Sequence, residues 1–159
     1  MSRRKLKKNT SLLSDPIYQS YLIQLLTNHI LKKGKKTLAY KIVQKMLHFI
    51  DTKTNKQEDP VDIFNKAINN LRPSFEIKTK RIGGAVYKMP IEINYYRSLT
   101  LAVQFLLNAT YLKTGKLFYV KLATEILEAS QNTGAAIRKK DEIHKIAESN
   151  VKLKKKKIN

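Results

Sequence analysis

The sequence predicts a mainly α single domain, made of six helices with one inserted β-hairpin arm and bounded by basic, disordered tails. Apolar residues recur at helical spacing in six separate segments of the 159-residue chain. Between the third and fourth segments, over about 75–93, the spacing changes to alternation around a Gly-Gly pair. Residues 1–13 and 151–159 contain many Lys and Arg and no acid, which is typical of unfolded basic tails. The folded domain is therefore predicted to span 14–150.

An acidic residue followed by proline begins two of the first three predicted helices, at Asp15-Pro16, after Ser14, and at Asp59-Pro60. This pair supplies a polar cap and a proline at the first helical position. The first helix is predicted to end at Gly34. The second covers about 38–50 and is followed by a polar loop. The third is stopped by Pro73, because the residue before a proline is pushed out of the α region.

The hairpin is predicted from a strand over 75–82 in which apolar and basic residues roughly alternate. Gly83-Gly84 is a two-residue turn signal, and the return strand covers 85–93. Pro90 confines that return strand to a sheet edge or a strand end. A two-stranded ribbon is marginal in water, so it must lean on the helices or project as a basic arm.

Helical spacing returns near Leu99 and is predicted to end near Gly115, and a fifth helix is predicted to end at Gly134. A last, mostly polar helix is predicted from about Ala136 to Asn150.

The charge of the chain points to a polyanionic partner. Lys and Arg number 32 against 12 acids, which gives a net charge of +20. Self-repulsion at this charge opposes the compact state, and nucleic acid or an anionic membrane would relieve it. No apolar run is long enough for a transmembrane helix, and the basic start lacks the apolar core of a secretory signal. Cysteine is absent, which excludes disulfides and thiolate metal sites and suits a reducing compartment.

Residues typical of catalysis or metal binding are few. His29 and His48 lie in apolar helical patterns, and His144 completes the histidines, without an H-x-x-x-H pair or a cluster of carboxylates. Gly83-Gly84 lacks the spacing of a phosphate-binding loop. We therefore predict no enzyme activity, no cofactor and no metal site.

The basic residues form short clusters at helix ends, in loops and on the ribbon. Such clusters suit the phosphates of a folded RNA, and neutralising about 8 phosphates gives a slope of log K against log salt of about −6 to −7. Tyr87, Tyr95 and Tyr96 stack on unpaired bases or pack against the protein. A helix-turn-helix DNA-binding protein would need one recognition helix dense in base-reading residues, and a membrane-active protein one basic amphipathic helix. The clusters are Arg3, Arg4, Lys5, Lys7 and Lys8; Lys32, Lys33, Lys35 and Lys36; Lys78, Lys80, Arg81 and Lys88; Arg138, Lys139, Lys140 and Lys145; and Lys152 to Lys157.

Several segments, in consistent order over about 1–150, resemble one known family. The most specific is Lys80-Arg81-Ile82-Gly83-Gly84, followed by Tyr87 and Pro90-Ile91-Glu92. The others are Ser14 to Tyr18, Ile30 to Lys36, Asn70 to Pro73, Gly134 to Lys140 and, with His144, Ala147 to Asn150. Together they resemble the small-subunit ribosomal protein family called "S seven", in its bacterial and plastid form.

The resemblance implies six helices with a β-hairpin arm, in agreement with the spacing. It also implies binding to the 3′ major domain of small-subunit ribosomal RNA, nucleation of head assembly, and a position at the messenger RNA exit channel and the exit-site transfer RNA. Neighbouring ribosomal proteins of the head and platform are the implied protein partners. The implied contacts to ribosomal RNA are Arg3, Arg4, Lys5, Lys32, Lys33, Lys35, Lys36, Lys78, Lys80 and Arg81. Those near messenger or transfer RNA are Gly83, Gly84, Tyr87, Arg138, Lys139, Lys140 and Lys145.

The chain departs from the family pattern in two places. Gln104-Phe105 stands where the family usually has Arg-Trp, which removes an RNA contact at Gln104 while Phe105 still suits packing. Leu153 to Lys157 replaces an aromatic-rich end with charge. The resemblance favours a ribosome in a plastid, with a mitochondrion or the bacterial cytoplasm as alternatives.

Overall fold

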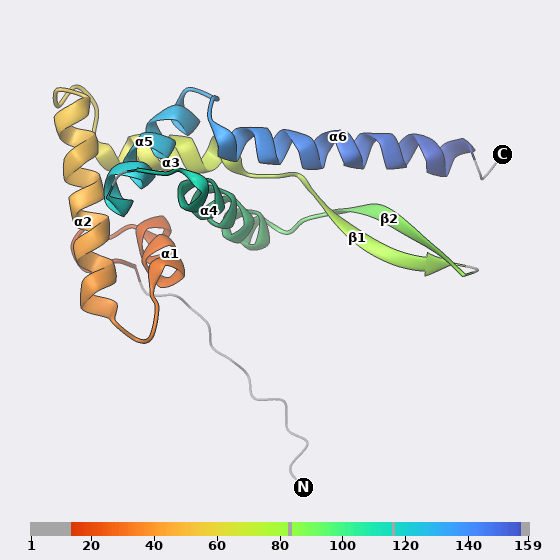
Figure 1. Cartoon of the computed structure of the whole chain (residues 1–159), viewed down its shortest axis with the longest axis horizontal. Coiled ribbons are helices and arrows are strands. Elements are labelled where there is room, and N and C mark those ends of the chain that lie inside the picture. Colours follow the sequence, from red (N-terminus) through yellow and green to blue (C-terminus); the bar gives the residue numbers. More distant parts are fainter. Residues whose placement is uncertain (1–13, 83, 116, 157–159) are drawn as a thin grey trace, which may run out of the picture.

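The computed structural model describes the backbone of residues 14–82, 84–115 and 117–156, which form six helices and one antiparallel hairpin (Figure 1). This confirms the predicted mainly α class. Helices α1 to α5 form a bundle, and α6 and the hairpin extend from it in the same direction (Figure 1). The elements are α1 Tyr21–Ile30, α2 Lys36–Lys53, α3 Pro60–Leu71, β1 Phe75–Ile82, β2 Ala85–Glu92, α4 Tyr95–Leu112, α5 Phe118–Ser130 and α6 Ala135–Lys156.

The core lies inside the bundle, where α5 packs against α2, α3 and α4. Each helix turns its apolar stripe inward, and the first residues of α6, Ala136 and Ile137, join the core. Phe105 is buried, as expected, and Gln104 is exposed. The largest side chains of the core are Ile23, Leu26, Met46, Ile50, Phe64, Ile68, Leu71, Leu99, Leu106, Leu122 and Ile126.

The predicted start of the first helix at Asp15-Pro16 is wrong. The buried carboxylate of Asp15 accepts the backbone N–H groups of Ile17 and Tyr18, at 3.1 and 2.9 Å, and so closes a separate turn. Gln19 then adopts a left-handed conformation with φ of 50°, and α1 begins only at Tyr21. It also ends before Gly34, at Ile30. The Asp59-Pro60 pair does begin a helix, α3, where Asp59 accepts the N–H of Val61 at 2.9 Å.

The last helix is longer than predicted. It continues through Lys156 instead of ending at Asn150, so most of the expected C-terminal tail is helical. Lysine and leucine are good helix formers, and nothing between 150 and 156 breaks the helix. At about 1.5 Å per residue, α6 is roughly 33 Å long. The predicted N-terminal arm, with Arg3, Arg4 and Lys5, lies outside the described residues.

The hairpin has the predicted bounds in β1 and ends at Glu92, one residue early, in β2. Ile82 pairs with Ala85 across the two-residue turn, in which Gly84 has φ of 85°. Pro90 lies opposite Ile77. With two strands, each is an edge, so the missing N–H of the proline interrupts no further strand.

A buried carboxylate fixes the start of α6. Glu125 of α5 has no solvent exposure. Its Oε1 accepts the N–H of Ala136 at 2.8 Å, and its Oε2 lies 2.6 Å from the Nζ of Lys113. Burial by itself lowers the pKa of Lys113, but the hydrogen bonds and charges of Glu125 and Glu128 outweigh it, so this pKa is raised. The sequence gives little indication of this network, because its one local sign is an acidic residue within the apolar run of α5.

Replacing Lys113 with Met leaves the Glu125 carboxylate buried without a cation, so we expect the free energy of unfolding to fall by about 3 kcal/mol. Urea denaturation at neutral pH measures this, with Lys66→Met, an exposed lysine of α3, as the control. The pKa of Lys113 is raised on folding. The stability lost in Lys113→Met is therefore largest at pH values below the ordinary pKa of lysine, and it disappears as pH rises through the folded-state pKa of Lys113.

The double variant Lys113→Met with Glu125→Gln should recover part of the loss. The amide oxygen of Gln still accepts the N–H of Ala136, and no charge remains buried. A double variant as unstable as Lys113→Met alone would contradict this account.

Candidate nucleic-acid interface

The base of the hairpin is held from two sides. On one side the ring of Phe75 meets His144 of α6 edge to face, at 6.3 Å between centroids, and His144 Nε2 accepts the N–H of Ser74 at 3.2 Å. On the other side Arg97 of α4 donates to Glu76 at 2.8 Å. The sequence analysis did not single out this pair, because residues on two elements give no local signal of contact.

The two charged groups of this pair stabilise each other. The hydrogen bond from Arg97 holds the pKa of Glu76 below its usual range, and the pKa of Arg97 is raised in turn. The Arg97–Glu76 ion pair is therefore fully formed at pH values above the ordinary pKa range of glutamate, and it is lost as pH falls through the folded-state pKa of Glu76. Half of the arginine side chain is exposed, so the pair adds little stability but sets the direction in which the hairpin leaves the bundle.

The strand register distributes the basic residues over both faces of the hairpin. Residues directly opposite each other share a face, and successive residues alternate. Lys78 and Lys80 lie on the face of Glu76, which we call the α4-side face. Arg81 lies on the other face with Phe75, as does Lys88, the partner of Thr79. The basic residues predicted to cluster on the hairpin are therefore divided between its two faces. All four side chains are exposed, and the outer half of the hairpin is positive on both faces.

Gly83 lies outside the described residues, and of Tyr87 only the backbone is described, paired with Lys80. Gly84 is exposed at the turn.

The predicted residues of α6 divide into two kinds. Arg138 and Lys145 are exposed, and no acid pairs with either among the described residues. Lys139 is also exposed and pairs with Glu142 at 3.1 Å. Lys140 is different, because its Nζ donates to the backbone carbonyl of Asn70 at 2.8 Å. This lysine ties α6 to the end of α3, so its charge is partly committed to the fold.

The turn between α1 and α2 presents four exposed lysines. Lys33 and Gly34 both have positive φ, 52° and 73°, which brings the chain sharply into α2. No side chain caps the start of α2 and no acid lies in its first turn. The positive end of the helix dipole and the lysines therefore add, which favours an anion here.

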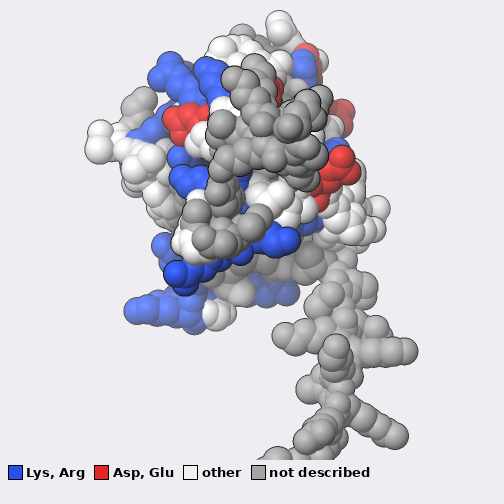
Figure 2. All heavy atoms as spheres, turned by 90° about the vertical axis from the view of Figure 1, so that its right-hand side faces the viewer, with Lys and Arg blue, Asp and Glu red and all other residues white. Residues whose placement is uncertain are grey.

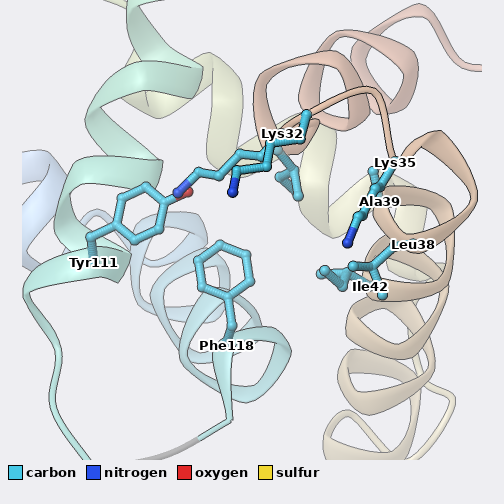
Figure 3. A pocket seen from close by; sticks show the side chains of 9 residues that line it. Lys32, Lys35, Leu38, Ala39, Ile42, Tyr111 and Phe118 are labelled. Carbon is cyan, nitrogen blue, oxygen red and sulfur yellow. The ribbon is translucent and has the colours of Figure 1, made fainter.

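Two of these lysines lie on aromatic rings. Lys32 Nζ is 4.7 Å from the ring centre of Tyr111, and Lys36 Nζ is 5.6 Å from that of Tyr40. Beneath the turn is a pocket of about 280 Å³ with mainly apolar walls, in which Tyr111 stacks on Phe118 and Leu38 and Ile42 lie opposite (Figure 3). Lys32, Lys33 and Lys35 of the turn also line this pocket.

The basic clusters extend along the whole molecule. The turn between α1 and α2 lies at the opposite end of the long axis from the hairpin tip (Figure 1). Viewed toward the ends of the hairpin and α6, Lys and Arg side chains gather mostly on one side, and acids are few and scattered (Figure 2). A partner that contacts all of these clusters must itself be large and anionic, like a folded nucleic acid.

Two other kinds of site are absent from the part of the chain that the structure describes. None of the helices in this part of the chain is both long and apolar enough to cross a membrane. This part also contains no group of three or more His, Cys, Asp or Glu placed to hold a metal ion.

Comparison with known proteins gives a consistent match over the chain. The family model described as ribosomal protein S7p/S5e matches residues 2–151. The small ribosomal subunit protein uS7c of Prototheca wickerhamii is 41% identical over 150 residues, covering 94% of this chain and 95% of the relative. That of Tupiella akineta is 42% identical with the same coverage. The protein uS7 of Mycoplasma mycoides subsp. mycoides is 41% identical over 148 residues, covering 93% and 94%.

Replacing Gly84 with Val should disrupt the hairpin while leaving the helices intact. A β-branched residue at a φ of 85° is strained by about 1–2 kcal/mol, and the two-residue turn has no slack to absorb it. Amide hydrogen exchange should show lost protection in β1 and β2 alone. Thr79→Val, an exposed strand position that suits a β-branched residue, is the control. Unchanged protection in Gly84→Val would show that the turn tolerates the side chain.

Proposed function

This chain belongs to the ribosomal protein S7p/S5e family, and on that premise we propose that it binds the 3′ major domain of small-subunit ribosomal RNA and nucleates assembly of the head. It is a structural protein of the small ribosomal subunit. Relatives of similar identity carry both plastid-type and bacterial names, so the proposal concerns the ribosome and no particular compartment.

The observation that best supports RNA binding is the exposure of basic side chains on three separate parts of the fold. They lie at the turn between α1 and α2, on both faces of the outer hairpin, and along α6. A duplex or a three-way junction of RNA presents phosphates at several angles, and separate short clusters suit it better than one stripe would. On this proposal Lys32, Lys33, Lys35, Lys36, Lys78, Lys80 and Arg81 contact ribosomal RNA.

We place the messenger RNA exit channel and the exit-site transfer RNA at the other end of the molecule. The hairpin and α6 both extend away from the bundle, so their outer parts are free to meet a second ligand (Figure 1). Gly84 is exposed at the hairpin tip and Lys145 is exposed along α6, whereas Arg138 and Lys139, also exposed, lie in the first turn of α6 beside the bundle. Lys140, bound to Asn70, would act chiefly by holding α6 in place. Neighbouring head and platform proteins would cover remaining surface of the bundle.

The proposal is tested by expressing the tagged chain in cells from its own source and sedimenting ribosomes in moderate salt. It should travel with small subunits, and its footprint on ribosomal RNA should be confined to the 3′ major domain. Recovery only in ribosome-free fractions would end the proposal. In gel shifts, preference for duplex DNA over structured RNA would favour a DNA-binding protein instead.

Replacing Lys35 and Lys36 with Ala should weaken binding to a 3′ major domain fragment and make the slope of log K against log salt shallower by about 1–2. Folding should change little, because both side chains are exposed. The matched control replaces Lys53 and Lys56, at the opposite end of α2 and roughly 27 Å away. An unchanged slope in the first variant would show that Lys35 and Lys36 are only solvated.

A further inference from the structure

We propose that Tyr96, with Tyr95 and Arg72 behind it, forms a stacking site for an unpaired RNA base beside the hairpin. This inference rests on the proposed RNA-binding function and adds a second mode of contact, one that does not depend on charge.

Two large aromatic rings are exposed side by side in the first turn of α4. Tyr95 is 53% exposed and Tyr96 66% exposed, and their rings meet edge to face at 5.7 Å between centroids. A tyrosine that serves packing covers most of its ring against the protein. Among the described residues, Tyr95 is the aromatic neighbour of Tyr96, and no Lys or Arg lies over the Tyr96 ring.

Tyr95 is held rigidly from below. The guanidinium of Arg72 lies 4.4 Å from the centre of its ring. Arg72 is itself oriented by its Nε, which donates to the Oγ of the buried Ser98 at 3.3 Å. The Ser98 hydroxyl in turn donates to the backbone carbonyl of Tyr95 at 2.7 Å. The pair of rings therefore has a fixed support, and a base that stacks on it orders little else.

Tyr111 is a contrasting case, because its ring already has partners within the protein. It is also about half exposed, but its ring stacks on Phe118 and carries Lys32 at 4.7 Å. A base would have to displace one of these to stack there. Tyr96 presents no such competitor.

Charge around the stacking platform, which consists of the exposed rings of Tyr95 and Tyr96, favours a nucleotide. Arg97, the next residue along α4, binds Glu76 and so joins the platform to the α4-side face of the hairpin. Lys78 lies on that face, close enough for its charge to lower the pKa of Glu76 further. A base on Tyr96 would thus have exposed lysines nearby for its phosphates, the combination typical of single-strand binding. Paired bases are already stacked on each other, so the ligand is a loop, bulge or unpaired strand.

The test uses the full chain and a short single-stranded RNA that carries one 2-aminopurine, whose fluorescence is quenched by stacking. Tyr96→Leu should weaken binding about 5- to 150-fold and abolish the quenching, because stacking contributes that range per base. Tyr96→Phe, which keeps the ring, should retain both. Tyr18→Leu, an exposed tyrosine outside α4, is the matched control.

The salt dependence separates stacking from charge. Tyr96→Leu should leave the slope of log K against log salt unchanged, whereas Lys78→Ala with Lys80→Ala should make it shallower. Equal affinity and equal quenching of Tyr96→Leu and the wild type would overturn the stacking site, and intact lysine effects would then leave the proposed function standing. If Tyr96→Leu keeps its RNA affinity but no longer sediments with small subunits, the platform contacts a protein and the proposal is wrong.

Discussion

The carboxylate of Glu125 joins three helices at a point without solvent. It accepts the N–H of Ala136 at the start of α6 and pairs with Lys113 just after α4, while its own backbone belongs to α5. Burying a charge is costly unless it is paired and hydrogen bonded, so the three helices have one arrangement that satisfies it. Gly134 makes room, because a Cβ there would lie 3.0 Å from Glu125 Oε1. The position of the hairpin follows, since its base packs on α6 through His144.

The parts of this fold that were predictable from the sequence are those with local causes. The hairpin followed from a two-residue glycine turn between alternating segments, and α3 followed from Asp59-Pro60. Asp15-Pro16 failed because the same side chain closed a turn instead, and only the left-handed Gln19 after it distinguishes the two outcomes. The extension of α6 has a local basis in the helix propensity of Lys and Leu, but the same lysine-rich composition is also typical of an unfolded tail. The network at Glu125 has no local signal strong enough to predict, since it depends on what the chain meets in space.

The candidate interface shows the same division. Sequence clustering identified basic residues that are exposed at the α1–α2 turn and on the hairpin. It did not reveal that Lys140 holds α3, because that contact joins residues 70 positions apart. It also left open which face of the hairpin each basic residue occupies, and the register places Arg81 on the face opposite that of Lys78. Counting charge therefore predicts a polyanionic partner, while the register and tertiary contacts determine which lysines are exposed.

The lysines that lie over aromatic rings have a thermodynamic consequence. A free lysine loses up to about 2 kcal/mol of rotamer entropy when it is immobilised. Lys32 over Tyr111 and Lys36 over Tyr40 each make a ring contact that favours some rotamers of the lysine over others. Part of the ordering that a ligand would otherwise impose has thus taken place during folding. With the proposed RNA ligand, the same unit of charge would contribute more net affinity at this turn than on an unsupported side chain, and the aromatic neighbours would act as preorganising residues without touching the ligand.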